Sequence, residues 1–240
     1  MLRWSLQFHK WIALVVGIQV LLWTLGGLVM TAIPIERVRS EHHVAERQPA
    51  PLVLDRVISA ESAAKAVGVS PVEAVLKATP RGPVWALKDQ AGKVAAVAAV
   101  TGRTLPPLSA GEAGALAAGA YKGEGRPGPA RYLADAPQET GREGPVWRVD
   151  FDDAESTTFY LAPDTGEVVS RRSNVWRFYD FFWRLHIMDL ETGEDFNHPL
   201  IVTVTGATLV IVVSGFVLLW IRLARDLRAV RARRAVAARP

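Results

Sequence analysis

The chain has 240 residues, of which half are hydrophobic and 22% are charged, and it contains no cysteine. The absence of cysteine excludes disulfides, iron–sulfur clusters, covalent c-type haem and thiol catalysis. The high hydrophobic and low charged fractions indicate a membrane protein. The net charge of +4 comes from an arginine-rich segment at residues 222–240, so it gives no reason to expect nucleic-acid binding.

Residues 11–33 form a first apolar segment of 23 residues without a charge. As a helix that rises 1.5 Å per residue it is about 34 Å long, enough to cross a hydrocarbon core of about 30 Å. The alternative is a cleaved signal peptide, which would have a shorter apolar region and an Ala-x-Ala-like exit. This segment ends in MTAIP instead. We therefore predict a permanent membrane anchor.

The residues between the two apolar segments form a loose tandem repeat, predicted at 57–107 and 108–172. Each copy opens with an alanine-rich segment that reads as a helix, ESAAKAV in the first and EAGALAAGAY in the second. The second helix has the spacing of a capping box from Ser109 to Glu112. Each copy continues with Gly-Pro-Val-Trp and strand-like segments that end in Thr-Gly. Alternating β-branched residues and an Asp-Thr-Gly turn predict antiparallel strands.

Four stretches of the repeat have a less regular pattern. Residues 70–73 resemble a helix start, but the repeat places a strand at 72–78, and we favour the strand. Residues 122–128 and 134–144 are rich in glycine, proline and charge, so we predict surface loops. The acidic run DFDDAE at 150–155 has carboxylates that attract cations, but we interpret it as the solvated turn of a hairpin.

Residues 199–221 form a second uncharged segment of 23 residues, closed by Arg222. Arg3 and Lys10 precede the first apolar segment and the arginine tail follows the second, whereas acidic residues lie near the opposite ends. Positively charged flanks stay on the cytoplasmic side. We therefore predict a bacterial inner-membrane protein with both termini in the cytoplasm and residues 34–198 in the periplasm.

Three motifs carry a resemblance to a known family. FHKW at residues 8–11 opens the first apolar segment, and WRLH at 183–186 precedes the second; both resemble the PepSY-associated transmembrane family. The pattern Y-x-x-x-x-T-G-E-V at 160–168 resembles the PepSY domain. The resemblance implies an α+β membrane protein in which two transmembrane helices flank a tandem PepSY-like domain of helices and antiparallel sheet.

These features divide the chain into seven predicted segments. They are the cytoplasmic N-terminus with transmembrane helix 1 (1–33), a periplasmic linker (34–56), the first PepSY-like repeat (57–107), the second (108–172), a juxtamembrane segment (173–198), transmembrane helix 2 (199–221) and a basic cytoplasmic tail (222–240). This division places every histidine at or outside the ends of the two apolar segments.

The histidines near the predicted membrane boundaries are candidate ligands of haem b, because neutral imidazole is its usual axial ligand and a six-coordinate haem needs two at one depth. His9 lies at the cytoplasmic end, whereas His186 and His198 lie at the outer end, so one haem cannot join His9 to either of them. An outer-side site within one chain would draw on His186, His198 and either His42 or His43. A cytoplasmic-side site would need His9 from a second chain.

Family members with more spans resemble haem-containing ferric-siderophore reductases and transmembrane electron conduits. The resemblance implies that His9 and His186 are ligands, whereas His42, His43 and His198 are only their neighbours. Two spans are half of the bundle that such proteins use, so this function requires a homodimer or a larger membrane complex. In the alternative interpretation His9 and His186 are interfacial residues hydrogen-bonded to backbone or lipid headgroups.

Two further motifs are interpreted as structural. Residues 205–208, Thr-Gly-Ala-Thr, resemble an acceptor at which FMN is attached through phosphate to the last threonine. Small residues are common in membrane helices, and Thr208 would lie about 13 Å into the span, so we attribute this motif to helix packing instead of covalent FMN. Ser62 and Lys65 match S-x-x-K without its accompanying motifs. With no hydrolase or transferase motif, enzymatic activity stays an open question.

We therefore predict an inner-membrane PepSY protein that binds haem b and acts as a transmembrane electron-transfer subunit linked to the reduction of iron from ferric siderophores. The alternative is a non-catalytic, membrane-tethered PepSY module that binds a periplasmic protein or serves as an accessory subunit. The expected partners are the lipid bilayer, a second copy of the chain, and either a periplasmic protein or a ferric siderophore.

Overall fold

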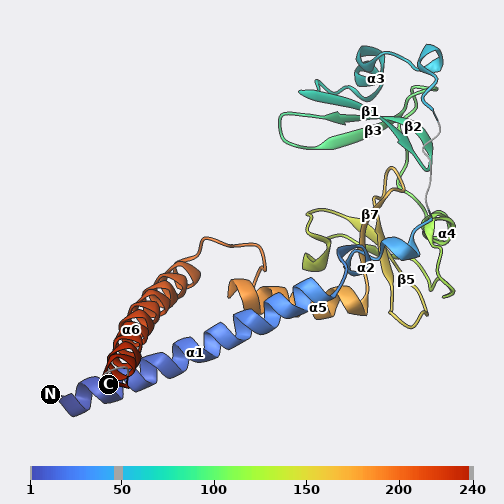
Figure 1. Ribbon diagram of the computed structural model, residues 1–240. Helices are drawn as coiled ribbons and strands as arrows, with labels where there is room; N and C mark the ends of the chain where they lie inside the picture. Colours follow the sequence, from blue (N-terminus) through green and yellow to red (C-terminus); the bar gives the residue numbers. More distant parts are fainter. Residues whose placement is uncertain (1, 46–50, 238–240) are drawn as a thin grey trace. The chain divides into compact units, whose positions relative to one another are not determined.

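The computed structural model describes residues 2–45 and 51–237, and the chain divides into two compact units (Figure 1). The membrane unit combines Met1–Ala32 with Asp180–Pro240. The second unit comprises Ile33–Tyr179, and we call it the outer unit because it lies outside the two apolar helices. Near both chain ends the structure describes the backbone of several residues without their side chains.

The membrane unit contains the two long apolar helices α1 (Leu2–Ala32) and α6 (Pro199–Ala237), which contact each other. Within the described residues, Leu14–Ala32 and Pro199–Arg231 are long and apolar enough to cross a membrane. Large apolar side chains are exposed along both helices. Exposed apolar surface of this extent suits contact with lipid. The two predicted apolar helices are confirmed, and they associate the protein with a membrane.

Helix α6 extends well beyond the predicted end of the second span at Ile221. It continues through Arg222 to Ala237 without a break, so the basic tail prolongs the same helix. Arginine and alanine are both strong helix formers, which explains the continuation after the apolar residues end.

The juxtamembrane segment forms a helix that the sequence analysis did not identify, α5 (Asn174–Ile187). Ser173 begins it, because its hydroxyl oxygen accepts a hydrogen bond from the backbone N–H of Trp176. The following loop folds back on α5: the indole of Trp183 donates to the carbonyl of Gly193 over 3.0 Å. The carboxylate of Asp189 accepts hydrogen bonds from four backbone N–H groups of the same loop.

The outer unit contains two modules that each combine a helix with an antiparallel sheet (Figure 1). In the first module, α3 (Ala60–Val67) packs on strands β1 (Glu73–Thr79), β2 (Gly82–Lys88) and β3 (Val94–Ala98), in the order β1-β2-β3. Its small core is built from fully buried side chains of α3, β2 and β3, namely Ala63, Leu87 and Val97. Strand β1 confirms the strand predicted at 72–78.

The second module is larger and more deeply buried. Its elements are α4 (Ala110–Ala120), β4 (Arg131–Leu133), β5 (Val146–Asp150), β6 (Thr158–Leu161) and β7 (Val168–Arg172), with sheet order β4-β5-β6-β7. All four residues of β6 are buried, and Phe159 and Leu161 pack against α4. The predicted capping box of α4 is confirmed, with both reciprocal hydrogen bonds between Ser109 and Glu112. Strand β4 was not predicted, because only three residues pair with β5.

The predicted linker at 34–56 is ordered where the structure describes it. It contains α2 (Ile35–Val38) and two short 3-10 turns, η1 (Glu41–His43) and η2 (Leu54–Arg56). A third turn, η3 (Gln138–Thr140), lies in the predicted loop before β5. Backbone hydrogen bonds join η1 to the end of α4: the N–H of Ala45 donates to Ala120 over 2.9 Å. The linker therefore brings the side chains of η1 to the second module.

Candidate functional site

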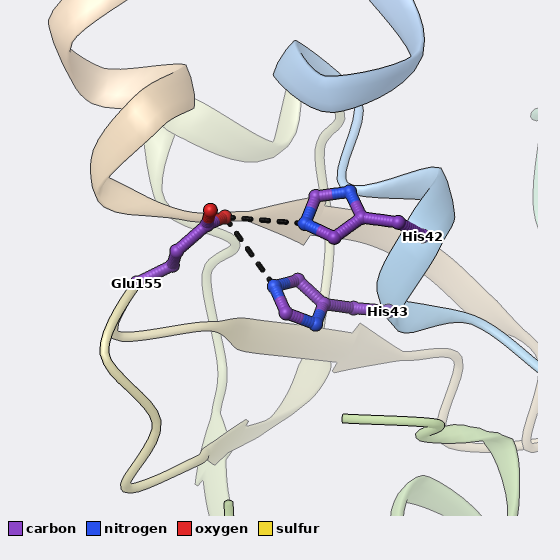
Figure 2. Close-up of side chains that lie close together, drawn as sticks. All are labelled: His42, His43 and Glu155. Carbon is purple, nitrogen blue, oxygen red and sulfur yellow. Dashed lines mark hydrogen bonds and ion pairs between the residues drawn. The ribbon is translucent and has the colours of Figure 1, made fainter. Parts of the chain in front are cut away.

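Two histidines of η1 meet a glutamate that follows β5 (Figure 2). The Nε2 atoms of His42 and His43 lie 3.4 and 3.3 Å from the same carboxylate oxygen, Oε2 of Glu155. The two imidazole rings lie side by side, with centroids 4.0 Å apart. One ligand atom from each of the three side chains lies within 4.8 Å of the other two. We call His42, His43 and Glu155 the outer cluster.

The local backbone explains why these side chains converge. Ser40, buried and in the left-handed region with a φ of 53°, reverses the chain just before η1. On the other side, the tight turn after β5 is fixed by Asp153, whose Oδ1 accepts the N–H of Thr157 over 2.8 Å. The carbonyl of Glu155 accepts the N–H of Asn174 over 2.7 Å. The turn that carries Glu155 is thus held by hydrogen bonds on both sides of this residue.

The Glu155 carboxylate stays ionised at neutral pH. Partial burial acts to raise its pKa, but hydrogen bonds from Arg37 and His43 outweigh burial, so the pKa is below its ordinary value. The guanidinium of Arg37 contacts the other oxygen, Oε1, at 3.2 Å. Oε2 is therefore left to face the two imidazoles.

Tyr121 and Asp153 lie next to His43 of the outer cluster. The hydroxyl of Tyr121 donates to Oδ2 of Asp153 over 2.6 Å, and this oxygen lies 3.9 Å from Nε2 of His43. Burial, followed by the bond to Asp153, raises the pKa of Tyr121 to about 12, so the hydroxyl remains a donor. The Tyr121 ring stacks on Phe151 with centroids 3.9 Å apart, which fixes its position. Gly123 lies so close that a Cβ there would be 3.0 Å from Nδ1 of His43.

An open hollow of about 550 Å³ lies beside the outer cluster and is lined by both histidines, Tyr121, the glycine-containing loop at 123–125 and the turn at 152–155. His42 is the more exposed histidine, with 42% of its side chain accessible, whereas His43 and Glu155 are at 14% and 19%. The cluster therefore combines fixed ligands with access from solvent.

The membrane unit places His186 against α1. A Cβ at Gly26 would lie 3.4 Å from Cβ and Nδ1 of His186 and from the carbonyl of Phe182, so glycine permits this close approach of α5 to α1. Gly26 lies six residues, or about 9 Å, before the end of the apolar segment at Ala32. His186 therefore contacts the apolar part of the helix.

Several buried polar atoms of the membrane unit make no hydrogen bond to any residue that the structure describes. They are Nδ1 of His186, Nε2 of Gln19, Nε1 of Trp23 and Oγ1 of Thr208. Gln19, Trp23 and Gly26 follow one another at helical spacing on α1, so two of these atoms share a face with the His186 contact. Unsatisfied polar atoms in apolar surroundings cost free energy. Ser40, Trp147, Thr157 and Ser170 of the outer unit also have a buried polar atom without a partner among the described residues.

His198 contacts the residue that follows His186. Its Nε2 lies 3.0 Å from the carbonyl oxygen of Ile187, the residue that follows His186. Because a carbonyl only accepts, Nε2 carries the proton and Nδ1 has a free lone pair. The side chain of His9 lies outside the described part of the structure, and His42 belongs to the outer cluster.

Sequence reasoning named His42 and His43 but did not connect them with Glu155, which it interpreted as part of a solvated turn. Figure 2 shows the carboxylate turned toward both rings. The ligands are 112 residues apart along the chain, and no local pattern encodes such a meeting. The adjacent histidines were the only usable signal, since imidazole is the commonest metal ligand.

Comparison with known protein families identifies a match over nearly the whole chain. The family described as PepSY-associated TM region matches residues 6–239, which is nearly the whole chain. No curated protein and no solved structure matches the sequence.

Proposed function

The chain belongs to the PepSY-associated TM region family, and we propose that it is a membrane subunit that binds haem b and passes electrons to an outer acceptor, with iron of a ferric siderophore as the acceptor class. The observation that carries this proposal is the imidazole of His186, whose buried Nδ1 lacks a hydrogen-bond partner among the described residues. Leaving such a nitrogen buried and unbonded costs about 1–3 kcal/mol. Ligation of an iron centre would remove this cost.

His198 supports an outer-side haem in a second way. A ligating histidine usually donates its other ring N–H to a carbonyl or carboxylate, which fixes the ring and its tautomer. The Nε2–H of His198 makes such a bond to the Ile187 carbonyl and leaves Nδ1 free for a metal. His186 and His198 are thus the pair that we assign to the haem.

The surrounding residues would bind and shield the group. Haem supplies a one-electron carrier, and the protein sets its potential through the ligands, the hydrogen bonds and the exclusion of water. The apolar residues of α1 and α6 exclude water, while Nε2 of Gln19 and Nε1 of Trp23 are donors without partners among the described residues. We assign a second, cytoplasmic-side site to the His9 residues of two chains in a dimer.

The experiment compares absorption spectra of the full chain purified in detergent after expression with added haem precursor. We expect a Soret band with the spectrum of a bis-imidazole haem in the wild-type protein and its loss in His186→Ala and His198→Ala. Phe181→Ala is the matched control, because this ring lies on the same helix but is 56% exposed. Circular dichroism and gel filtration establish that each variant keeps its helices.

A folded wild-type protein that stays colourless, even after reconstitution with hemin, would contradict the proposal. That result would favour the second candidate function, a membrane-tethered module that binds a periplasmic protein.

A further inference from the structure

We propose that His42, His43 and Glu155 bind a divalent first-row transition metal ion, such as Zn²⁺ or Fe²⁺, on the outer unit. The ligand atoms are Nε2 of each histidine and Oε2 of the glutamate. This site goes beyond the proposed haem function and does not depend on it, because none of its ligands belongs to the membrane unit.

The distances between the two ring nitrogens and the carboxylate oxygen also suit three ligands around an ion. Hydrogen bonds from nitrogen to oxygen normally span about 2.7–3.2 Å. The two Nε2 atoms lie 3.4 and 3.3 Å from Oε2, and both converge on this one oxygen. Two ligand atoms that are each about 2.0–2.1 Å from a zinc ion at a tetrahedral angle are about 3.4 Å apart. The two Nε2–Oε2 distances therefore already match those of ligand pairs around an ion.

The donor set indicates which class of ion binds. Two imidazole nitrogens favour zinc, iron, copper or nickel, whereas calcium and magnesium prefer sites built from oxygen alone. Three protein ligands leave at least one coordination position open. The adjoining hollow of about 550 Å³ gives that position access to water or to a small chelating ligand.

Residues around the ligands orient them as in known metal sites. Arg37 holds Oε1 of Glu155 at 3.2 Å, which leaves Oε2 as a single ligand oxygen. The ionised Asp153 lies 3.9 Å from Nε2 of His43 and adds negative potential without leaving its bond to Tyr121. Partners of this kind are part of the site, because their removal typically lowers metal affinity about 10- to 100-fold.

Binding would join two distant parts of the outer unit. His42 and His43 belong to η1, and Glu155 to the turn that precedes β6, more than a hundred residues later. An ion bound only in the folded state stabilises that state by mass action. Metal addition should therefore raise the thermal midpoint of the outer unit.

The test is isothermal titration of the full chain in detergent with Zn²⁺, after purification through a tag that contains no histidine. We expect saturable binding of one ion per chain and competition by Co²⁺, with visible bands of bound Co²⁺ in difference spectra. Glu155→Gln keeps the shape of the side chain but removes its charge, and it should lower the affinity at least tenfold, as should His43→Ala. Glu143→Gln, an exposed carboxylate elsewhere on the unit, is the matched control.

Three outcomes would overturn the proposal: no saturable binding by folded wild-type protein, binding that survives in both variants, or equal affinity for Mg²⁺ and Zn²⁺. The haem proposal is judged separately, because His186→Ala should keep full Zn²⁺ affinity while it loses the Soret band. If the protein binds zinc but not haem, the metal-site proposal holds and the haem proposal is wrong. If it binds haem but not zinc, the reverse is true.

Discussion

The membrane unit and the outer unit use the same side chain in opposite surroundings. His186 lies against Gly26 with a buried nitrogen that has no hydrogen-bond partner among the described residues. His42 and His43 instead share the ionised carboxylate of Glu155 at the edge of an open hollow. The groups around an imidazole therefore decide its chemistry. An apolar contact suits a haem ligand, whereas a carboxylate beside water suits a small cation.

Close packing of glycine supports both sites, although by different means. At Gly26 a helix backbone approaches another helix, so the glycine sets the position of His186. At Gly123 a loop approaches Tyr121 and His43, so the absence of a side chain there leaves room for both rings. Substitution of Gly26 therefore tests the haem site, and substitution of Gly123 tests the outer cluster. Neither change alters a proposed ligand.

The largest effect is expected for Gly26→Leu. The added side chain would enter the contact with His186 and Phe182, and overpacking of this kind costs about 1–3 kcal/mol. We expect haem occupancy, measured as the ratio of Soret to protein absorbance, to fall about tenfold. Gly27→Leu is the control, because a Cβ there has no described neighbour within 4 Å. Equal loss in the two variants would mean that the α1–α5 contact does not position His186.

A smaller effect is expected for Gly123→Ala. The new methyl group would overlap the Tyr121 hydroxyl, which is held by Asp153, and would crowd His43. We expect a loss of about 1–3 kcal/mol in unfolding free energy, from denaturant melts, and weaker Zn²⁺ binding in the calorimeter. Haem occupancy should not change, since this glycine belongs to the outer unit.

Gly119→Ala is the control for this prediction. A Cβ at Gly119 has no described neighbour within 4 Å, and alanine in a helix is favoured over glycine by about 1 kcal/mol. It should raise stability slightly and leave zinc affinity unchanged. If Gly123→Ala behaves like Gly119→Ala, the packing of Tyr121 does not matter for the outer cluster.

The smallest effect is expected from acid. Burial acts to raise the pKa of Glu139, but hydrogen bonds from Arg177 and Tyr160 outweigh it and lower the pKa. A lowered folded-state pKa stabilises the protein above the ordinary carboxyl pKa, and this stabilisation is lost as the pH falls through the folded value. The thermal midpoint of the outer unit should therefore drop by a few degrees as the pH falls below the ordinary carboxyl pKa.

Glu139→Gln should flatten this acid dependence, because the glutamine does not titrate, whereas the exposed Glu143→Gln should leave it unchanged. Far-ultraviolet circular dichroism of the helices in detergent should be much less sensitive to pH over the same range. A midpoint that falls equally in the wild type and in Glu139→Gln would show that other carboxylates dominate.

The sequence predicted the elements whose signals are local. Twenty-three uncharged residues in a row fix a membrane helix, and the reciprocal side chains of Ser109 and Glu112 fix the start of α4. Strand β1 was also predicted, because the repeat outweighed a helix-start pattern at Ser70. Strand β4 and helix α5 were not, since β4 is only three residues long and α5 begins with a single serine cap.

By itself the sequence determined the two apolar helices, the two helix-and-sheet modules and the histidines worth considering, because periodicity and composition act over a few neighbouring residues. Only the tertiary structure decided the partners of those histidines. The carboxylate of Glu155 reaches His42 and His43 because backbone hydrogen bonds join η1 to the end of α4 and the turn after β5 to Arg126. His186 meets Gly26 because two helices pack. Such contacts depend on the folded backbone, which no short stretch of residues specifies.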